Sequence, residues 1–394
     1  MLRKMPWILL AVIFFVSLLG DQISPAYQSI LLAISLSIKS LIISVLPFVI
    51  FGLLFKTAVS FASKASKMIL LIFAAICGSN FLSTLLSYNV GTLLYTFDVS
   101  MSLPTSEHVL LPAWEWSAPK WIGNDQALLS GLALGLVIGW TKPSLALKIG
   151  SFLDMGVNGI LKAILCTIPL FLAGFIVKMA HEHVIGAIFH HYLAVFVMIT
   201  SAVFTYIGLI YLVVNRCQLQ ETFQSLKNMA AAAIAGFGSM SSAAAMPLTI
   251  LGVEKNSRNP VLASCIIPST VNIHLIGDCF AIPIFAFAVM KSFGVAEPSF
   301  FTYLIFASYF VLAKFSVAAV PGGGILVMLP ILEQYLGFQG EMLSLITALY
   351  ILFDPVITCA NVLGNGGFAL VIDRANGTTA QEDASALELL DKSL

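Results

Sequence analysis

Four polar residues recur at helical spacing in an apolar stretch near the end of the sequence. In FDPVITCANVLGNGGFALVIDR, residues 353–374, Asp354, Thr358, Asn361 and Asn365 are separated by steps of four, three and four. Residues at these steps share one face of a helix. A carboxylate at bilayer depth costs on the order of 3 kcal/mol on insertion scales and usually has a function. We therefore predict that the stripe contacts a polar ligand; the alternative for Asp354 is a hydrogen bond that serves helix packing alone.

The composition places this stripe in a membrane protein. Of the 394 residues, 59% are hydrophobic and 10% are charged, which lies far from the make-up of soluble domains. A transmembrane helix needs about 20 predominantly apolar residues. We therefore predict an all-α integral membrane protein with eight spans. These fall at about residues 6–20, 29–61, 67–97, 127–141, 150–180, 187–214, 260–290 and 341–372.

The charges predict the orientation of the chain. The net charge is zero, so nothing points to a nucleic-acid partner. Lys and Arg gather in alternate loops, and the positive-inside rule then places both termini in the cytoplasm of a bacterial-type inner membrane. The first segment resembles a signal peptide but lacks a clear cleavage site, so we favour a retained span. The six cysteines are scattered, without a metal-binding pattern.

Two further segments have the pattern of a helical hairpin that enters a membrane without crossing it. They lie at about 220–258 and 300–338, where apolar arms too short to span flank a tip rich in small residues. Such tips leave backbone groups free, which membrane depth tolerates only inside protein or beside a wet cavity. The two hairpins start on opposite sides of the predicted topology, so they are read as inverted repeats of a secondary transporter. Two ordinary hairpins in the membrane interface are the alternative.

Residues from about 150 to 374 resemble the dicarboxylate/amino acid:cation symporter family, which includes the glutamate-transporter homologues. The first tip, GSMSSAAAMP, is similar to the serine-rich tip of that family, and VPGGG at 320–324 is similar to its second tip, Val-Pro-Gly-x-Gly. The last span resembles the pattern D-x-x-R-T-x-x-N-x-x-G-D. The matching residues are Ser241, Ser242, Pro247, Asp354, Thr358, Asn361 and Gly364.

The resemblance implies a homotrimer and an elevator mechanism, in which the hairpins and the last two spans carry the substrate past a scaffold. Residues 1–215 are then mainly scaffold, with 67–97 assigned to the transport domain. Residues 216–374 form the transport domain, and 375–394 form a cytoplasmic tail. In this family pattern Asp354 holds the ammonium of an amino acid and Asn361 its carboxylate, helped by backbone N–H groups of the tips.

The chain departs from the family where an acidic substrate would need a partner. Ile357 and Met240 stand at the two positions where relatives supply an arginine, and Tyr350 replaces an aspartate that braces it. Without arginine, a substrate side-chain carboxylate would be buried unpaired at a cost of several kcal/mol. We therefore predict a neutral amino acid as substrate, with Ile357 lining its pocket. The predicted substrate-binding residues are Ser241, Ser242, Val320, Gly322, Asp354, Ile357, Thr358 and Asn361.

The positions that bind sodium in the family are also altered. The family motif N-M-D-G-T aligns with residues 274–278, so Ile276 replaces a sodium-binding aspartate, and Asn365 replaces a second one. Sodium prefers hard oxygen ligands and gains from anionic ones. We predict that sodium coupling is weakened or lost. Asp278 points elsewhere unless its segment is unwound, because two helical positions turn a side chain by about 200°.

Two other groups could replace the missing cation. Lys314 lies in the otherwise apolar arm VLAKFS, where its ammonium can pair with Asp278 or cap hairpin carbonyls; the alternative is that it extends to the membrane surface. His274 and Asp278 are one helical turn apart, a spacing that suits proton transfer. The coupling ion is therefore sodium, a proton or none, and no metal or other cofactor is expected.

Other functions remain as alternatives. They are a carrier of small carboxylates or dicarboxylates, and a non-transporting receptor or channel on the same scaffold. No nucleophile and base pair stands out, so we expect no enzyme. The expected partners are a small-molecule amino acid, membrane lipid and further copies of the chain.

Overall fold

The computed structural model describes residues 8, 11, 12, 15, 16, 22–63, 67–96, 110–119, 121–182, 185–317 and 322–375. Every regular element in these residues is a helix, which confirms the all-α class. The predicted span at 6–20, the tail after residue 375 and the predicted site residue Val320 fall largely or wholly outside the described residues.

Among the described residues, five helices are long and apolar enough to cross a membrane. A shorter apolar helix, α4 (Asn124–Thr141), is separated from α5 by Lys142 alone. The residue before a proline is pushed out of the helical region, so the chain bends ahead of Pro143. The predicted total of eight spans stays a prediction. The five long helices are α2 (Pro25–Ser63), α3 (Lys67–Thr96), α5 (Pro143–His181), α6 (Ile185–Val214) and α13 (Gly340–Ala375).

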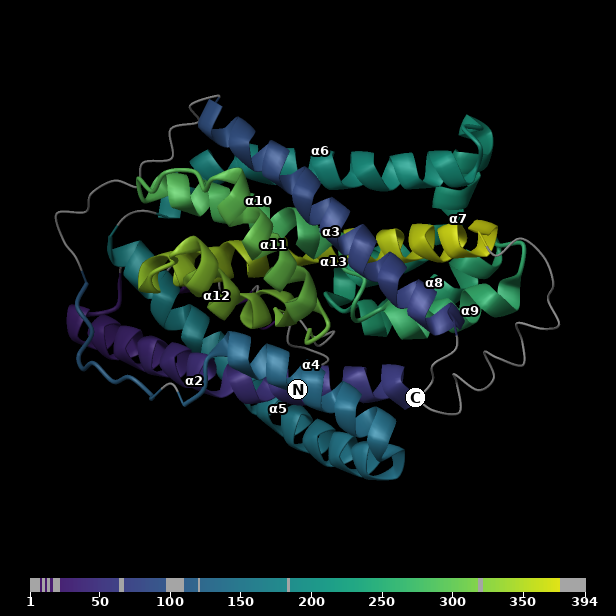
Figure 1. Ribbon diagram of the computed structural model, residues 1–394. Coiled ribbons are helices and arrows are strands. Elements are labelled where there is room, and N and C mark those ends of the chain that lie inside the picture. Colours follow the sequence, from purple (N-terminus) through teal and green to yellow (C-terminus); the bar gives the residue numbers. More distant parts are fainter. Residues whose placement is uncertain are drawn as a thin grey trace.

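The helices pack in two groups. In the first, α2 lies against both α4 and α5, at the bottom of Figure 1. Gly131, Gly135 and Gly139 of α4 face α2 at four-residue spacing, and a Cβ at Gly131 would lie 2.7 Å from the carbonyl oxygen of Phe51. Small residues at this spacing let two membrane helices approach closely. The α2–α4 interface therefore depends on these glycines.

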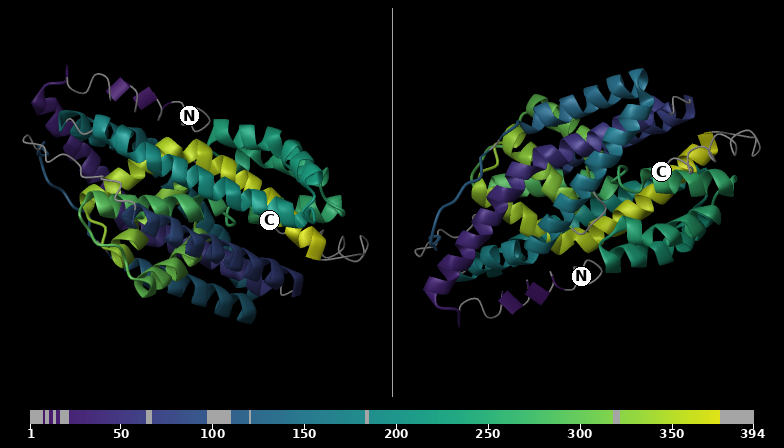
Figure 2. Two further views of the ribbon diagram at one scale, coloured as in Figure 1. Left: turned by 90° about the horizontal axis from the view of Figure 1, so that it is seen from above. Right: turned by 90° about the horizontal axis from the view of Figure 1, so that it is seen from below.

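The second group is built around α10 and α13. Helix α3 packs on α10, and α6 runs alongside α13 (Figures 1 and 2) and also contacts α10. The predicted division into a scaffold and a transport domain stays a prediction. Helix α6 falls in the predicted scaffold range 1–215 and packs on the helices of the second group. Its large apolar side chains meet α10 and α13, with Phe196 stacked 4.8 Å from Phe353.

Two helix–turn–helix units flank α13. The first joins α7 (Leu219–Ser239) to α8 (Ser242–Glu254), and the second joins α11 (Phe300–Lys314) to α12 (Gly323–Leu336). Met240 adopts a left-handed conformation that ends α7, and the Ser241 hydroxyl accepts from the N–H of Ala244 to begin α8. The two units approach the middle of α13 from opposite ends (Figure 1). Their tips therefore meet beside the polar stripe.

The span predicted at 260–290 is not one helix. It consists of α9 (Pro260–Thr270) and α10 (Ile276–Ser292), with a non-helical segment between them. Asn80 of α3 fixes this break, because its amide donates to the carbonyl of Ile273 at 2.7 Å and accepts from the N–H of Leu275 at 3.2 Å. The break exposes backbone groups inside the protein and changes where Asp278 points.

Charged side chains join the two groups of helices. Lys39 of α2 donates to the carbonyl of Gly340 at the start of α13 over 3.2 Å, and Lys178 of α5 pairs with Glu341. Both contacts lie at one end of α13. These exposed polar contacts contribute little stability each, and buried apolar residues of α2 and α5 also share one core with α10 and α13.

The opposite end of α13 is anchored through Asp373, which is 4% exposed. Its carboxylate accepts from the N–H groups of Arg258 and Asn259, at 2.8 and 2.9 Å, just before α9 begins. It also accepts from the Arg374 guanidinium at 2.8 Å. These bonds tie the start of α9 to the end of α13.

We expect the substitution Asp373→Ala to lower the free energy of unfolding by about 1–3 kcal/mol, because it leaves backbone donors without an acceptor. The measurement is the melting temperature of the protein in detergent. Arg258→Ala is the matched control, since it keeps the backbone N–H and removes an exposed side chain. Equal melting temperatures for the two variants would exclude the anchoring role.

Candidate functional site

A small cavity lies where the two hairpin tips and the α9–α10 break meet the polar stripe of α13. Its volume is about 20 Å³, which is room for about one water molecule. The sequence-predicted residues Ser242, Asp278, Asp354, Thr358 and Asn361 are all among its walls. The complete lining is Met240, Ser242, Asn272, Leu275, Asp278, Val317, Gly324, Tyr350, Asp354, Thr358 and Asn361.

Asp354 faces the start of α12. One carboxylate oxygen accepts from the backbone N–H of Gly322 at 2.9 Å, and the other accepts from the Thr358 hydroxyl at 3.0 Å. Gly322 has φ +73°, a left-handed conformation that favours glycine. A carboxylate at a helix N-terminus is stabilised by the free N–H groups and the helix dipole. Asp354 therefore closes the second hairpin tip onto α13.

Asn361 joins α13 to α10. Its side-chain oxygen accepts from the N–H of Gly277 at 2.8 Å. A Cβ at Gly277 would lie 2.4 Å from the carbonyl oxygen of Ile357, so only glycine permits this approach. The Asn361 amide nitrogen donates to no described residue, and Asn361 lines the cavity.

Ile357, which is predicted to line the substrate pocket, is not among the residues that line this cavity. The side chain is 2% exposed and belongs to the apolar core. Asp354, Thr358 and Asn361 share the face of α13 that meets the cavity, and position 357 lies beside that face. Apolar contacts with a ligand are instead available from Met240, the residue that precedes the first tip, and from Leu275 and Val317.

Asp278 is held by two partners. The Tyr350 hydroxyl donates to one carboxylate oxygen at 2.7 Å, and the Lys314 ammonium lies 3.2 Å from the other. Lys314 makes no hydrogen bond of good geometry among the described residues, so its attraction to Asp278 is that of two opposite charges. The ammonium also lies 4.6 Å from the centre of the Phe310 ring.

Lys314 does not extend to the membrane surface. Its side chain is fully buried, whereas the alternative interpretation required an exposed ammonium. Asp278 lies in the first turn of α10, directly after the non-helical segment, and its carboxylate faces Lys314. Gly324 makes room for the pair, because a Cβ there would lie 2.4 Å from the Tyr350 hydroxyl oxygen.

His274 and Asp278 are not joined by any hydrogen bond or ion pair in the described structure. The histidine precedes the first residue of α10, so the helical spacing that suggested a pair does not apply. Its Nε2 lies 2.8 Å from the Ser79 hydroxyl of α3, and its ring packs 4.3 Å from the ring of Phe368. The Asn365 amide donates to the carbonyl of His274 at 3.1 Å.

Sequence reasoning missed the contribution of α3. Ser79 and Asn80 hold the broken segment from outside the hairpins, and Asn80 is fully buried. The available signal was the polar run GSN within the predicted span at 67–97, since polar groups inside a span usually have a partner. From the sequence, Tyr350 is recognisable only as the replacement of an aspartate of the family. Its hydrogen bond to Asp278 gives it a role in positioning that carboxylate.

We expect Lys314→Met to destabilise the protein by about 3–5 kcal/mol, because it leaves the Asp278 charge buried without a partner. The double variant Lys314→Met, Asp278→Asn should recover most of this loss, since neither charge remains. Melting temperatures of the two single variants and the double variant, in detergent, measure the coupling. Additive losses in the double variant would contradict an energetic pair.

Comparison with known proteins agrees with this architecture. The sequence model of the sodium:dicarboxylate symporter family matches residues 126–375, which include both hairpins, the broken helix and α13. A search of individually characterised proteins gave no significant match. Members of the matched family are transporters and not enzymes. The match covers more than half of the chain, so the chain belongs to the sodium:dicarboxylate symporter family of membrane transporters.

Proposed function

We propose that the protein carries a neutral amino acid across the membrane without a bound sodium ion. One observation supports this most strongly: the charged groups that line the cavity are the carboxylates of Asp278 and Asp354. Lys314 lies behind Asp278 and does not line the cavity. A ligand with an ammonium group is therefore favoured, and a ligand with an additional carboxylate is disfavoured.

The cavity offers separate partners for the two ends of an amino acid. The ammonium can pair with Asp354, which now accepts from Gly322 and Thr358. The carboxylate can accept from the amide of Asn361 and from N–H groups at the start of α8, where Ser241 and Ser242 begin the helix. Helix N-termini are favourable sites for anions because their first N–H groups have no helical partner.

An acidic side chain would be repelled in this site. It would approach Asp278, and two carboxylates in a medium of low dielectric constant interact unfavourably. No arginine is available at Met240 or Ile357 to offset the charge. The same reasoning disfavours dicarboxylates, because their second carboxylate would also face Asp278.

Protein groups stand where cations would bind in the family. The ammonium of Lys314 pairs with Asp278. The Asn365 amide donates to the His274 carbonyl, and Asn365 stands where the family pattern has an aspartate. These contacts support a carrier in which an ammonium and an amide of the protein take the place of a bound cation. Proton coupling through His274 has less support, because Ser79 and not Asp278 is its partner.

Transport would require the second hairpin tip to move. The cavity holds about one water molecule and no amino acid, and the Gly322–Asp354 hydrogen bond closes it. We propose that residues 216–374, with α3 and α6, move as the transport domain against α2, α4 and α5. We further propose that the protein is a homotrimer in a bacterial inner membrane, with both termini in the cytoplasm.

We expect neutral amino acids to raise the melting temperature of the detergent-solubilised protein equally in sodium and in choline buffer. A ligand at 100 times its dissociation constant stabilises the folded state by about 2.7 kcal/mol. Glutamate and aspartate should give no shift. A shift that appears only with sodium, or one with an acidic ligand, would overturn the proposed site.

The variant Asp354→Asn tests whether the shift comes from this cavity. It keeps the shape of the side chain and removes the charge that an ammonium needs, so neutral amino acids should no longer stabilise the protein. Asp154→Asn is the control, because Asp154 pairs with Lys56 on the first group of helices, far along the chain from the cavity. An unchanged shift in Asp354→Asn would place ligand binding elsewhere.

We expect sodium to stabilise the variant Lys314→Ala but not the original protein. Alanine leaves space beside the buried carboxylate of Asp278, and a hard cation prefers such an oxygen ligand. Titration with sodium chloride, matched against choline chloride, measures the effect on the melting temperature. The additional substitution Asp278→Asn should abolish it, and absence of any sodium effect in Lys314→Ala would show that the ammonium does not occupy a cation position.

A further inference from the structure

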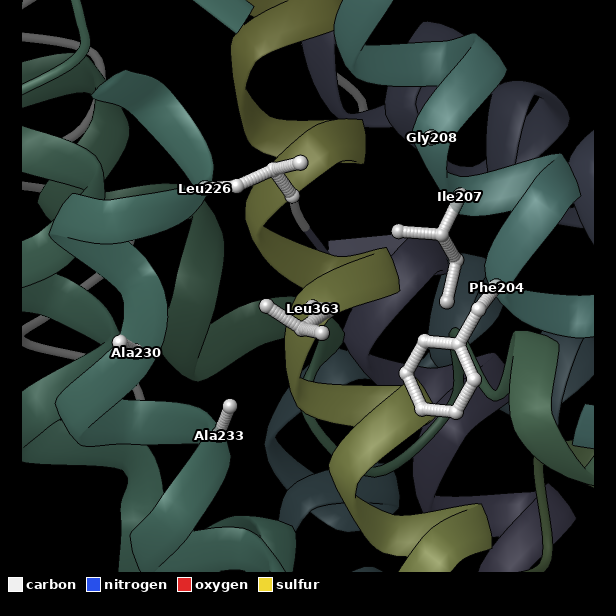
Figure 3. Close-up of a pocket in the computed structure, with 7 residues that line it drawn as sticks. All are labelled: Phe204, Ile207, Gly208, Leu226, Ala230, Ala233 and Leu363. Carbon is white, nitrogen blue, oxygen red and sulfur yellow. The ribbon is translucent and has the colours of Figure 1, made fainter. Parts of the chain in front are cut away.

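An apolar crevice of about 350 Å³ opens between α6, α7 and α13, away from the polar cavity. Figure 3 shows its walls, with Phe204 and Ile207 of α6 opposite Leu226 of α7 and with Leu363 of α13 at the back. Gly208, Ala230 and Ala233 have small side chains and leave the space open. A Cβ built at Gly208 would have no atom within 4 Å. The crevice is therefore a slot and not a packing defect that a side chain already fills.

One face of α7 continues this slot along the helix. Phe223 is 71% exposed and Ile234 is 72% exposed. The opposite face, including Met229 and Gly236, is buried against the rest of the protein. Exposed apolar side chains on one helical face require an apolar environment. The stripe consists of Leu219, Phe223, Leu226, Ala230, Ala233, Ile234 and Phe237.

The walls of the slot suit a thin apolar occupant. Gly208, Ala230 and Ala233 place small side chains between α6 and α7, and the other lining side chains are apolar. An extended acyl chain is an apolar group of this kind, and the charges beside the slot indicate which lipid carries it.

Positive side chains lie at the turn and beside the crevice. Arg216 is exposed in the turn that joins α6 to α7, and Lys227 is exposed on α7 next to Leu226 of the lining. Arg216 has φ +53° in a tight turn, and the side chains of Asn215 and Ser225 are hydrogen-bonded at 3.2 Å across it. Gly208 precedes Arg216 by eight residues, a rise of about 12 Å on a helix. A lipid whose phosphate lies at this turn can therefore place its acyl chain in the slot.

We propose that this crevice binds one anionic phospholipid, with an acyl chain between α6 and α7 and the phosphate at Arg216 and Lys227. Basic side chains beside a gap between membrane helices are a known means of recognising anionic headgroups. The lipid fills the space between α6 and the first hairpin, which contact each other only sparsely. The site is separate from the proposed substrate cavity and does not depend on it.

The test compares phosphatidylglycerol with phosphatidylcholine, each added to the full-length protein in mild detergent. Native mass spectrometry reports lipid retained per chain, and the melting temperature reports stabilisation. We expect one retained phosphatidylglycerol and a higher melting temperature. Gly208→Leu, which fills the slot, should bind it about tenfold more weakly. The control Gly159→Leu adds the same side chain where a Cβ at Gly159 also meets no atom within 4 Å, and it should bind normally.

A second pair of variants keeps the proposal testable if Gly208→Leu fails to fold. Ala233→Leu fills the slot from α7, and Ala231→Leu places the same bulk on an exposed position outside the lining. The double variant Arg216→Gln, Lys227→Gln should lose the preference for phosphatidylglycerol over phosphatidylcholine. Unchanged retention in the slot-filling variants, or equal retention of the two lipids by the original protein, would overturn the proposal.

Discussion

The buried ion pair of Asp278 and Lys314 is the interaction on which the site depends. Removing each charge from water costs several kcal/mol, and only a partner and further hydrogen bonds offset that cost. Here the partner comes from α11, the hydrogen bond comes from Tyr350 on α13, and the carboxylate comes from α10. Three helices must therefore hold their relative positions for either charge to be tolerated. Helix α12 can join them only because Gly324 leaves room for the pair.

The site is built from interrupted helices because continuous ones have no free backbone groups. The start of α12 supplies the N–H of Gly322 to Asp354, and the start of α10 supplies the N–H of Gly277 to Asn361. The gap between α9 and α10 would expose further backbone groups, and Asn80 satisfies two of them. Side-chain amides thus stabilise the broken backbone on one side, while the opposite side remains available to a ligand.

The local pattern of the sequence was sufficient for most helices and for the two helix–turn–helix units, because apolar length and small-residue tips are local signals. It was also sufficient to bring Asp354, Thr358 and Asn361 together, since they share one helical face. It was insufficient for the break before Ile276, because the break is held by a contact with Asn80, about 195 residues away. The expected pairing of His274 with Asp278 failed for the same reason. The packing of α6 likewise depends on distant partners that no local pattern specifies.

The buried charges also determine how a membrane potential would act on the proposed carrier. Asp278 and Lys314 cancel each other, and the remaining charge near the cavity is that of Asp354. A zwitterionic amino acid adds one positive and one negative group, so the total charge of the site is the same when it is empty and when it is loaded. Moving one elementary charge across a potential of 100 mV changes the free energy by about 2.3 kcal/mol. Because the loaded and the empty site carry the same charge, the membrane potential would act equally on both forms. In such a carrier the concentration gradient of the substrate alone would drive net transport. A cation that bound and moved together with the substrate would instead make the loaded carrier more positive than the empty one. In the proposed carrier, a lysine in place of a bound cation would therefore alter both the ion requirement and the driving force.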